Sequence, residues 1–327
     1  MYWYYKVPLL ILLALCLFGC GMLIWNRLPN NIRSTITPNG NAEESAAGED
    51  DRSHADAGEP ANQRDSKKKR SAPIPQVVLK RLRAARTQLD GNNLESARSL
   101  AQKVLSNEDV EPFSQPWRKA ADIVSEVNTK LINSDIPCEE KAVYRIKKGD
   151  SLARIAKQFN TTIGALQRSN NLDPNSARIY PGETLHIYQA DWNILVVKEA
   201  FALLLRDGDE VFKLYETGIG RQNRTPTGTF KVTSKQKEPA WTPPGKIIPY
   251  GDPENVLGTR WLGLTPTDET DPNLRGYGIH GTWEPETVGT AASEGCVRMR
   301  NEEVNELFDL VPMGTAVRIR NEHNDEE

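Results

Sequence analysis

The chain has 327 residues, of which 41 are basic and 44 acidic, so its formal net charge is −3. This near balance argues against a protein that binds nucleic acid through overall positive charge, and no nucleic-acid partner is expected. The length allows two or three domains, and an apolar fraction of 38% suits several modest cores. The four cysteines fit neither a disulfide framework nor a paired zinc site. They are Cys16, Cys20, Cys138 and Cys296. No metal or other cofactor is predicted.

Residues 7–25 form an apolar run of 19 positions without a charged side chain. As a helix this run would measure about 29 Å, close to the thickness of the hydrocarbon core of a bilayer. It could be a retained anchor, a cleaved signal, or a lipoprotein signal that ends at Cys20. We favour a transmembrane anchor, preceded by a short N-terminal tail of residues 1–6.

A polar segment follows the apolar run, from residue 26 to residue 73. Asn, Ser, Ala, Gly and Pro are frequent in it, and an acidic cluster precedes the basic run 67–70. Such a composition cannot bury enough apolar surface to fold, so we predict a disordered tether. We interpret the basic run as a solvated part of that tether and assign it no function.

Helical periodicity covers residues 74–133. Apolar residues recur three or four positions apart in three runs and predict three amphipathic helices. They are Val78, Leu82, Ala85 and Leu89, then Leu94, Ala97, Ala101, Val104 and Leu105, then Ala121, Val124, Val127 and Leu131. The second run and the turn before it resemble part of a tetratricopeptide repeat, but one repeat is too few for a stable solenoid. We therefore expect a small helical spacer packed on itself rather than a partner-binding repeat.

Residues 143–188 have the pattern of a small compact unit. A short strand at 143–146 is followed by a turn that ends at Asp150 and by the apolar stripe of a helix. Thr162 is expected to cap a second helix, and a closing strand follows at 184–187. The predicted order is strand, helix, helix, strand.

The sequence of this unit resembles a LysM module. The matching positions are the run from Tyr144 to Leu152, the Ile155-Ala156 pair, Leu166, Asn170, and the run from Ile179 to Glu183. The resemblance implies that the module binds N-acetylglucosamine-containing glycan through the loops after its first strand and after its second helix. The candidate glycan-binding residues are Gly149, Asp150, Ser151, Asn170, Pro181 and Gly182. The same residues are ordinary turn and helix-cap formers, so a structural role for them stays open.

From residue 192 to residue 320, short alternating runs broken by turn signals predict strands and hairpins. Within this region His280, flanked by glycines, precedes Cys296 by 16 residues, and Asn301 is expected to cap a helix. A lone cysteine or a lone histidine is more often structural than catalytic. The setting here favours chemistry, because Gly295 lets backbone approach the thiol and a sheet can bring imidazole to thiol.

A thiol beside an imidazole suits acyl transfer. Attack on an amide requires the thiolate, the imidazole supplies the base and then the acid, and backbone N–H groups beside the cysteine can hold the oxyanion. Residues 192–320 also resemble the YkuD-type L,D-transpeptidase catalytic domain. The motifs that carry this resemblance are Thr225 to Phe230, Asn255 with Gly258, Tyr277 to Thr282, and Ser293 to Arg298.

The resemblance implies a β-rich, sandwich-like catalytic domain, followed by a polar tail at 321–327, and so a multidomain α+β protein. Cys296 would be the nucleophile, His280 the general base and acid, and the Gly281 carbonyl the group that orients the imidazole. Gly295 and Cys296 would contribute backbone N–H groups to the oxyanion hole. Ser293 and Arg298 would shape the site.

By the same resemblance the protein is a cell-envelope cysteine acyltransferase. It would attack the carbonyl before the D-alanine of a peptidoglycan tetrapeptide stem, expel D-alanine, and pass the acyl group from the thioester to an acceptor amine, which builds cross-links. Two alternatives stay open: an L,D-carboxypeptidase with water as the acceptor, and a non-catalytic peptidoglycan-binding protein. The folded domains are expected on the outer, periplasmic side of the cytoplasmic membrane.

One position departs from the family pattern, because many members have a histidine where this chain has Glu294. A carboxylate that faced the thiol would raise the pKa of the cysteine by like-charge repulsion. We expect Glu294 instead to face solvent, with Arg298 as its partner.

Overall fold

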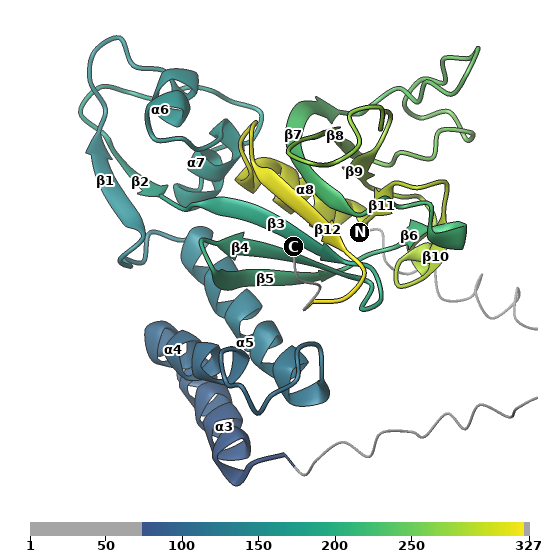
Figure 1. Ribbon diagram of the computed structural model, residues 1–327. Helices are drawn as coiled ribbons and strands as arrows, with labels where there is room; N and C mark the ends of the chain where they lie inside the picture. The colour runs from purple at the N-terminus through teal and green to yellow at the C-terminus, as the bar shows by residue number, and fades with distance from the viewer. Residues whose placement is uncertain (1–73, 324–327) are drawn as a thin grey trace, which may run out of the picture. The chain divides into compact units, whose positions relative to one another are not determined.

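The computed structural model describes residues 74–323 (Figure 1). The predicted anchor at 7–25 and the predicted tether at 26–73 lie outside the described residues. Among the helices of the described range, none combines the length and the apolar character needed to cross a membrane.

The three helices that the periodicity predicts are α3 (Gln76–Asp90), α4 (Leu94–Leu105) and α5 (Gln115–Ile132). Their apolar stripes form a common core with residues of the neighbouring sheet, which are Leu195, Val197, Leu204 and Val211. Polar groups also join the two layers, because the Asn128 amide donates to the Phe212 carbonyl (2.9 Å). The expectation of a spacer packed only on itself is therefore wrong: burial of apolar residues on the sheet adds to burial between the helices.

The LysM-like unit has the predicted order of elements. It consists of β1 (Lys141–Arg145), α6 (Leu152–Gln158), α7 (Ile163–Ser169) and β2 (Thr184–Tyr188), with β1 and β2 antiparallel. The hydroxyl of Ser151 accepts the Arg154 N–H, and that of Thr162 accepts the Ala165 N–H, so these residues cap the two helices. Both helices are short, and they bury Leu152, Ile155, Ala156 and Leu166 in a small core of the unit. Ala165 of α7 instead belongs to the core of the large sheet.

The described residues after the LysM-like unit are built on one eight-stranded sheet, with strand order β11-β9-β8-β7-β12-β3-β4-β5 (Figure 1). In chain order the strands are β3 (Trp192–Val197), β4 (Ala202–Asp207), β5 (Glu210–Glu216), β7 (Gly228–Lys237), β8 (Arg260–Pro266), β9 (Gly278–His280), β11 (Val297–Arg298) and β12 (Ala316–Arg320). A small parallel pair, β6 (Ile219–Gly220) and β10 (Ala291–Ser293), stands beside it.

Helix α8 (Asn301–Leu310) covers one face of this sheet. Its buried Val304 and Leu307 share a core with strand residues such as Ile279 and Val297. Helices α3, α4 and α5 share the other core, on strands β3 to β5. The predicted sandwich-like arrangement is thus wrong in this respect, because helices rather than a second large sheet cover the apolar faces.

Helix α7 of the LysM-like unit packs against α8. Arg168 forms an ion pair with Asp309 (2.9 Å), and the Thr162 hydroxyl donates to the Asp309 carbonyl. Gly164 lies so close that an added Cβ would stand 2.8 Å from the Cβ of Asp309. Through these contacts between α7 and α8, the LysM-like unit is held against the domain that contains the large sheet.

Candidate active site

Two neighbouring strands bring the predicted cysteine and histidine together. His280 ends β9, and Cys296 directly precedes β11, which pairs in parallel with β9 so that Arg298 lies opposite His280. Continued by one residue pair, this register places Cys296 beside Gly278, whose backbone N–H bonds to the sulfur. The thiol also donates to the Gly276 carbonyl (3.6 Å). Because side chains alternate along a strand, Gly278 and His280 face the same side, and the thiol lies diagonally across from the imidazole.

The imidazole of His280 is buried, and its tautomer follows from one contact. Its Nδ1 lies 2.6 Å from the Gly281 carbonyl, which can only accept, so Nδ1 carries the proton. In the neutral ring Nε2 then keeps its lone pair. Burial lowers the pKa of His280 to about 4, against the opposing effect of the carbonyls of Gly281 and Leu257. The ring is therefore neutral at pH 7 and able to accept a proton at Nε2. Trp261 stacks on it at 5.9 Å between ring centroids.

The thiol of Cys296 is half-buried, and burial raises its pKa above the ordinary value. The Gly278 N–H and the nearby Arg298 guanidinium act in the opposite direction. The resting site is therefore a neutral thiol beside a neutral imidazole. In such a pair the thiol proton moves to the base as the sulfur attacks.

The loop that carries the thiol is held by one buried hydroxyl. Ser293 Oγ donates to the Cys296 carbonyl (2.6 Å) and accepts the Gly295 N–H (3.1 Å). Gly295 has φ +137°, and an added Cβ would meet a ring carbon of Tyr277 at 2.9 Å, so only glycine fits.

This arrangement corrects the expected oxyanion hole. The Gly295 N–H is already bonded to Ser293 in this conformation, so it is not available for an oxyanion. In the described part of the chain, no hydrogen bond uses the Cys296 N–H. Of the two predicted N–H groups, only that of Cys296 is therefore open to a developing negative charge.

Arg298 is largely buried and braces the neighbouring turn. Its guanidinium bonds to the Glu284 carboxylate (3.2 Å) and to the Thr287 hydroxyl (3.3 Å). The expected pair between Glu294 and Arg298 is therefore wrong. Glu294 pairs instead with Arg221 and Arg224, while its carboxylate is exposed as we expected.

Asn301 also differs from its predicted role, because its side chain does not cap α8. Its amide donates to the Thr282 carbonyl (2.9 Å), and its oxygen accepts the Thr259 N–H (3.1 Å). Asn301 thus ties the segment after His280 to the start of β8. The pattern of a polar residue before an apolar stripe does not distinguish this long-range role from a cap.

Comparisons with known proteins match both parts of this architecture. The YkuD family model, described as the L,D-transpeptidase catalytic domain, matches residues 191–319, and the LysM domain model matches residues 144–187. YkuD of Bacillus subtilis, which bears the name of an L,D-transpeptidase, is 34% identical over 182 residues, covering 54% of this chain and 97% of its own length. This chain belongs to the L,D-transpeptidase family.

Another L,D-transpeptidase by name, YqjB of Bacillus subtilis, is 38% identical over 131 residues, 40% of this chain and 72% of its own length. A solved L,D-transpeptidase structure from Mycobacterium smegmatis is 20% identical and covers 42% of this chain and 63% of its own. Its TM-score is 0.32. Membership of the family, shown by the sequence relatives, supports a transpeptidase that modifies peptidoglycan.

In the LysM module of this L,D-transpeptidase, the candidate glycan-binding side chains have structural partners. Asp150 accepts from the Tyr144 hydroxyl and the Lys147 N–H, both at 2.8 Å, and Ser151 caps α6. Asn170 donates to the carbonyls of Leu166 and His186 and accepts the His186 N–H. The contacts therefore explain these three side chains as parts of turns and caps.

The main chain brings two of the candidate loops side by side. The Gly182 N–H donates to the Ile146 carbonyl (2.8 Å), so the turn at Pro181 lies beside the loop that contains Gly149. Pro181 and Gly182 are exposed, and the Gly149 carbonyl accepts from Arg154 (2.7 Å). Exposed backbone groups in this pair of loops remain candidates for sugar contacts.

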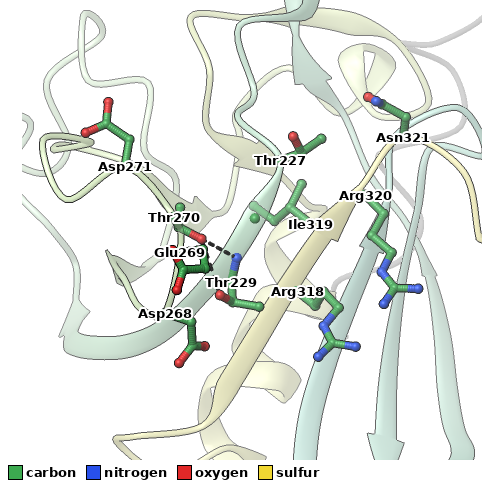
Figure 2. A pocket seen from close by; sticks show the side chains of 11 residues that line it. Thr227, Thr229, Asp268, Glu269, Thr270, Asp271, Arg318, Ile319, Arg320 and Asn321 are labelled. Carbon is green, nitrogen blue, oxygen red and sulfur yellow. Dashed lines mark hydrogen bonds between the residues drawn. The ribbon is translucent and has the colours of Figure 1, made fainter. Parts of the chain in front are cut away.

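A cavity of about 740 Å³ opens elsewhere on the catalytic domain of the L,D-transpeptidase, where β7, β12 and the loop after β8 meet (Figure 2). Thr229 donates its N–H to the hydroxyl of Thr270 (2.8 Å) and so fastens that loop to β7. Neither Cys296 nor His280 lines this cavity. It is separate from the candidate active site.

Proposed function

We propose that this L,D-transpeptidase forms a thioester at Cys296 with a peptidoglycan stem peptide and transfers the acyl group to an amine. The observation that carries the proposal is the placement of the Cys296 thiol beside Gly278 of β9, diagonal to His280. The Nδ1 proton of His280 is fixed on the Gly281 carbonyl, which leaves Nε2 as the base.

The reaction follows from these groups. The sulfur attacks the carbonyl that joins the third stem residue to D-alanine, while the thiol proton passes to His280 Nε2. The tetrahedral oxyanion accepts the Cys296 N–H. Collapse breaks the C–N bond, His280 returns the proton to the leaving amine of D-alanine, and a thioester remains. An acceptor amine then attacks the thioester, loses a proton to His280, and restores the thiol.

The LysM module supports a peptidoglycan substrate, because it would hold N-acetylglucosamine-containing glycan beside the site that acts on the stem. Binding of the polymer raises the local concentration of stems without any new contact at the thiol. Because α7 contacts α8, the LysM module and the catalytic domain would bind the glycan and the stem peptide of the substrate as a single unit. As part of the same proposal, the enzyme acts in the cell envelope, on the side of the membrane where peptidoglycan lies.

The test is mass spectrometry of the full-length protein mixed with a disaccharide tetrapeptide, with Cys296→Ala as the matched variant. We expect a covalent adduct that has lost D-alanine, on the wild type alone. Cross-linked dimers as the product would support transfer to an amine. Trimmed monomers would instead support the L,D-carboxypeptidase alternative, in which water is the acceptor. Neither adduct nor product, with an accessible thiol and retained glycan binding, would overturn catalysis in favour of a peptidoglycan-binding protein.

A further inference from the structure

Beside the thiol, two arginines converge on one carboxylate. Arg221 Nη2 contacts Glu294 Oε1, and Arg224 Nη1 contacts Glu294 Oε2. All three side chains are well exposed: the accessible fraction is 53% for Arg221, 45% for Arg224 and 64% for Glu294. We call these three residues the arginine clamp. Two cations against one anion leave the clamp with a net charge of +1.

The main chain fixes the clamp in place relative to the nucleophile. The buried Thr225 hydroxyl donates to the Gly295 carbonyl (2.9 Å) and accepts the Gly220 N–H (2.7 Å). Gly220 lies so close that an added Cβ would stand 2.8 Å from the Gly295 Cα. The segment with both arginines is therefore anchored to the loop that carries Cys296.

The turn between the two arginines explains how both reach the same group. Gln222 and Asn223 have φ of +51° and +59°, the left-handed region that ordinary side chains rarely adopt. Such a pair of residues reverses the chain within one turn. The arginines that flank them, Arg221 and Arg224, can then point at a single carboxylate.

We propose that Arg221 and Arg224 form a binding site for a carboxylate of the donor peptide, and that Glu294 occupies this site until the donor arrives. The inference rests on the proposed thioester chemistry. Guanidinium groups match carboxylates in shape and charge, and the site already holds one. Exposed ion pairs are weak, so a second carboxylate exchanges readily with Glu294.

The position of the clamp defines which carboxylate it recognises. Glu294 is two residues from Cys296, a span of at most about 7 Å of chain. The recognised group therefore belongs to a donor residue close to the acylated carbonyl, rather than to a distant part of the glycan. The clamp selects donors that carry a free carboxylate there over donors in which the same group is an amide.

The test compares two donor tetrapeptides that differ only in whether this carboxylate is free or amidated. The rate of thioester formation on the full-length protein is followed by mass spectrometry as a function of donor concentration. We expect Glu294→Gln to lower the half-saturating concentration of the free-acid donor about 5-fold, and that of the amidated donor less than about 2-fold. Arg221→Gln and Arg224→Gln should each remove the preference for the free acid.

The control is Glu126→Gln, because Glu126 also bridges two cations, Arg86 and Lys130, but lies on α5 away from the thiol. It should leave both donors unchanged. Equal effects of Glu294→Gln on the two donors, or a preference that survives both arginine substitutions, would overturn the inference. Calorimetry with Cys296→Ala protein measures the binding of both donors, and hence the preference for the free acid, without catalysis. A failure of the wild type to form the thioester would therefore refute the proposed function and not the clamp.

Discussion

The protonation of His280 is set by its burial between strands rather than by a carboxylate partner. The carbonyls of Gly281 and Leu257 favour the protonated ring, but desolvation outweighs them and lowers the pKa to about 4. A base of this kind is neutral throughout the physiological range. In the proposed reaction it would accept the thiol proton only while the sulfur attacks, which fits a cysteine that rests as the thiol.

This pKa makes stability depend on pH. Unfolded His280 binds a proton below about pH 6.5, whereas the folded ring does so only below about 4, so the unfolded state binds more protons between these values. The contribution of His280 is therefore complete above pH 6.5 and decreases by up to about 3 kcal/mol as the pH falls to 4. Urea unfolding should show a steeper loss of stability over this window in wild type than in His280→Asn. Parallel losses in the two proteins would contradict the prediction.

Glu294 is expected to have little influence on the nucleophile. Its carboxylate is neutralised by Arg221 and Arg224, whereas the pKa of Cys296 responds to burial, to the Gly278 N–H and to Arg298. Glu294→Gln should therefore shift the thiol pKa by less than about half a unit. Arg298→Gln should raise it, because a cation that favours the thiolate is lost.

The measurement is the rate of Cys296 alkylation against pH, in a background in which Cys16, Cys20 and Cys138 are replaced by Ala. These three thiols would otherwise react as well, although burial raises the pKa of Cys138 to about 11. A drop of a unit or more in Glu294→Gln would show that the carboxylate faces the thiol after all.

At the scale of elements, helix α5 shares a core with the sheet of the catalytic domain and does not pack only on the other helices. The Asn128 amide reaches the Phe212 carbonyl, and the Ser125 hydroxyl accepts the Leu214 N–H (3.1 Å). Asn128 is buried, and its loss would leave the Phe212 carbonyl without this partner.

We expect Asn128→Ala to lower the free energy of unfolding of the whole described region by about 1–3 kcal/mol. Because the helices and the sheet share a core, the helical signal and the tryptophan signal should report the same thermal transition, and the substitution should shift both together. Arg83→Ala, at an exposed position of α3, is the control and should change stability little. Helices that melt separately, with an unchanged sheet, would contradict the shared core.

The sequence predicts the elements well and their partners poorly. Apolar residues that recur three or four positions apart locate α3, α4 and α5. Motif spacing locates Cys296 and His280. Both signals can be detected because each lies within a short stretch of chain. Asn128 and Glu294 have partners 84 and 70 or more residues away, and neither pattern nor propensity encodes which distant group a polar side chain will meet.

At the scale of the whole described chain, the LysM module and the catalytic domain meet through α7 and α8. The ion pair of Arg168 with Asp309 is partly buried, and Gly164 allows the two helices to approach closely. This contact would hold a bound glycan strand at a constant position relative to the thiol.

Gly164→Ala should push the helices apart, because the new Cβ would stand 2.8 Å from the Cβ of Asp309. We expect acylation by a soluble disaccharide tetrapeptide to change less than about 2-fold, and acylation by polymeric peptidoglycan to slow about 5-fold. Arg178→Ala, at an exposed position of the same module, serves as the control. Equal slowing on both substrates would mean that the substitution damages the active site itself.

The two edges of the large sheet are covered by different contacts, one of them made by the helices. At β5, the last strand of the order, outward-facing main-chain groups are already bonded to Asn128, Ser125 and Gln102. At the opposite border β11 has only two residues, and Arg298 exchanges both main-chain bonds with Gly218 (2.8 and 2.9 Å). Main-chain groups at both edges of the described sheet are thus already bonded, which disfavours edge-to-edge pairing with a strand from another molecule.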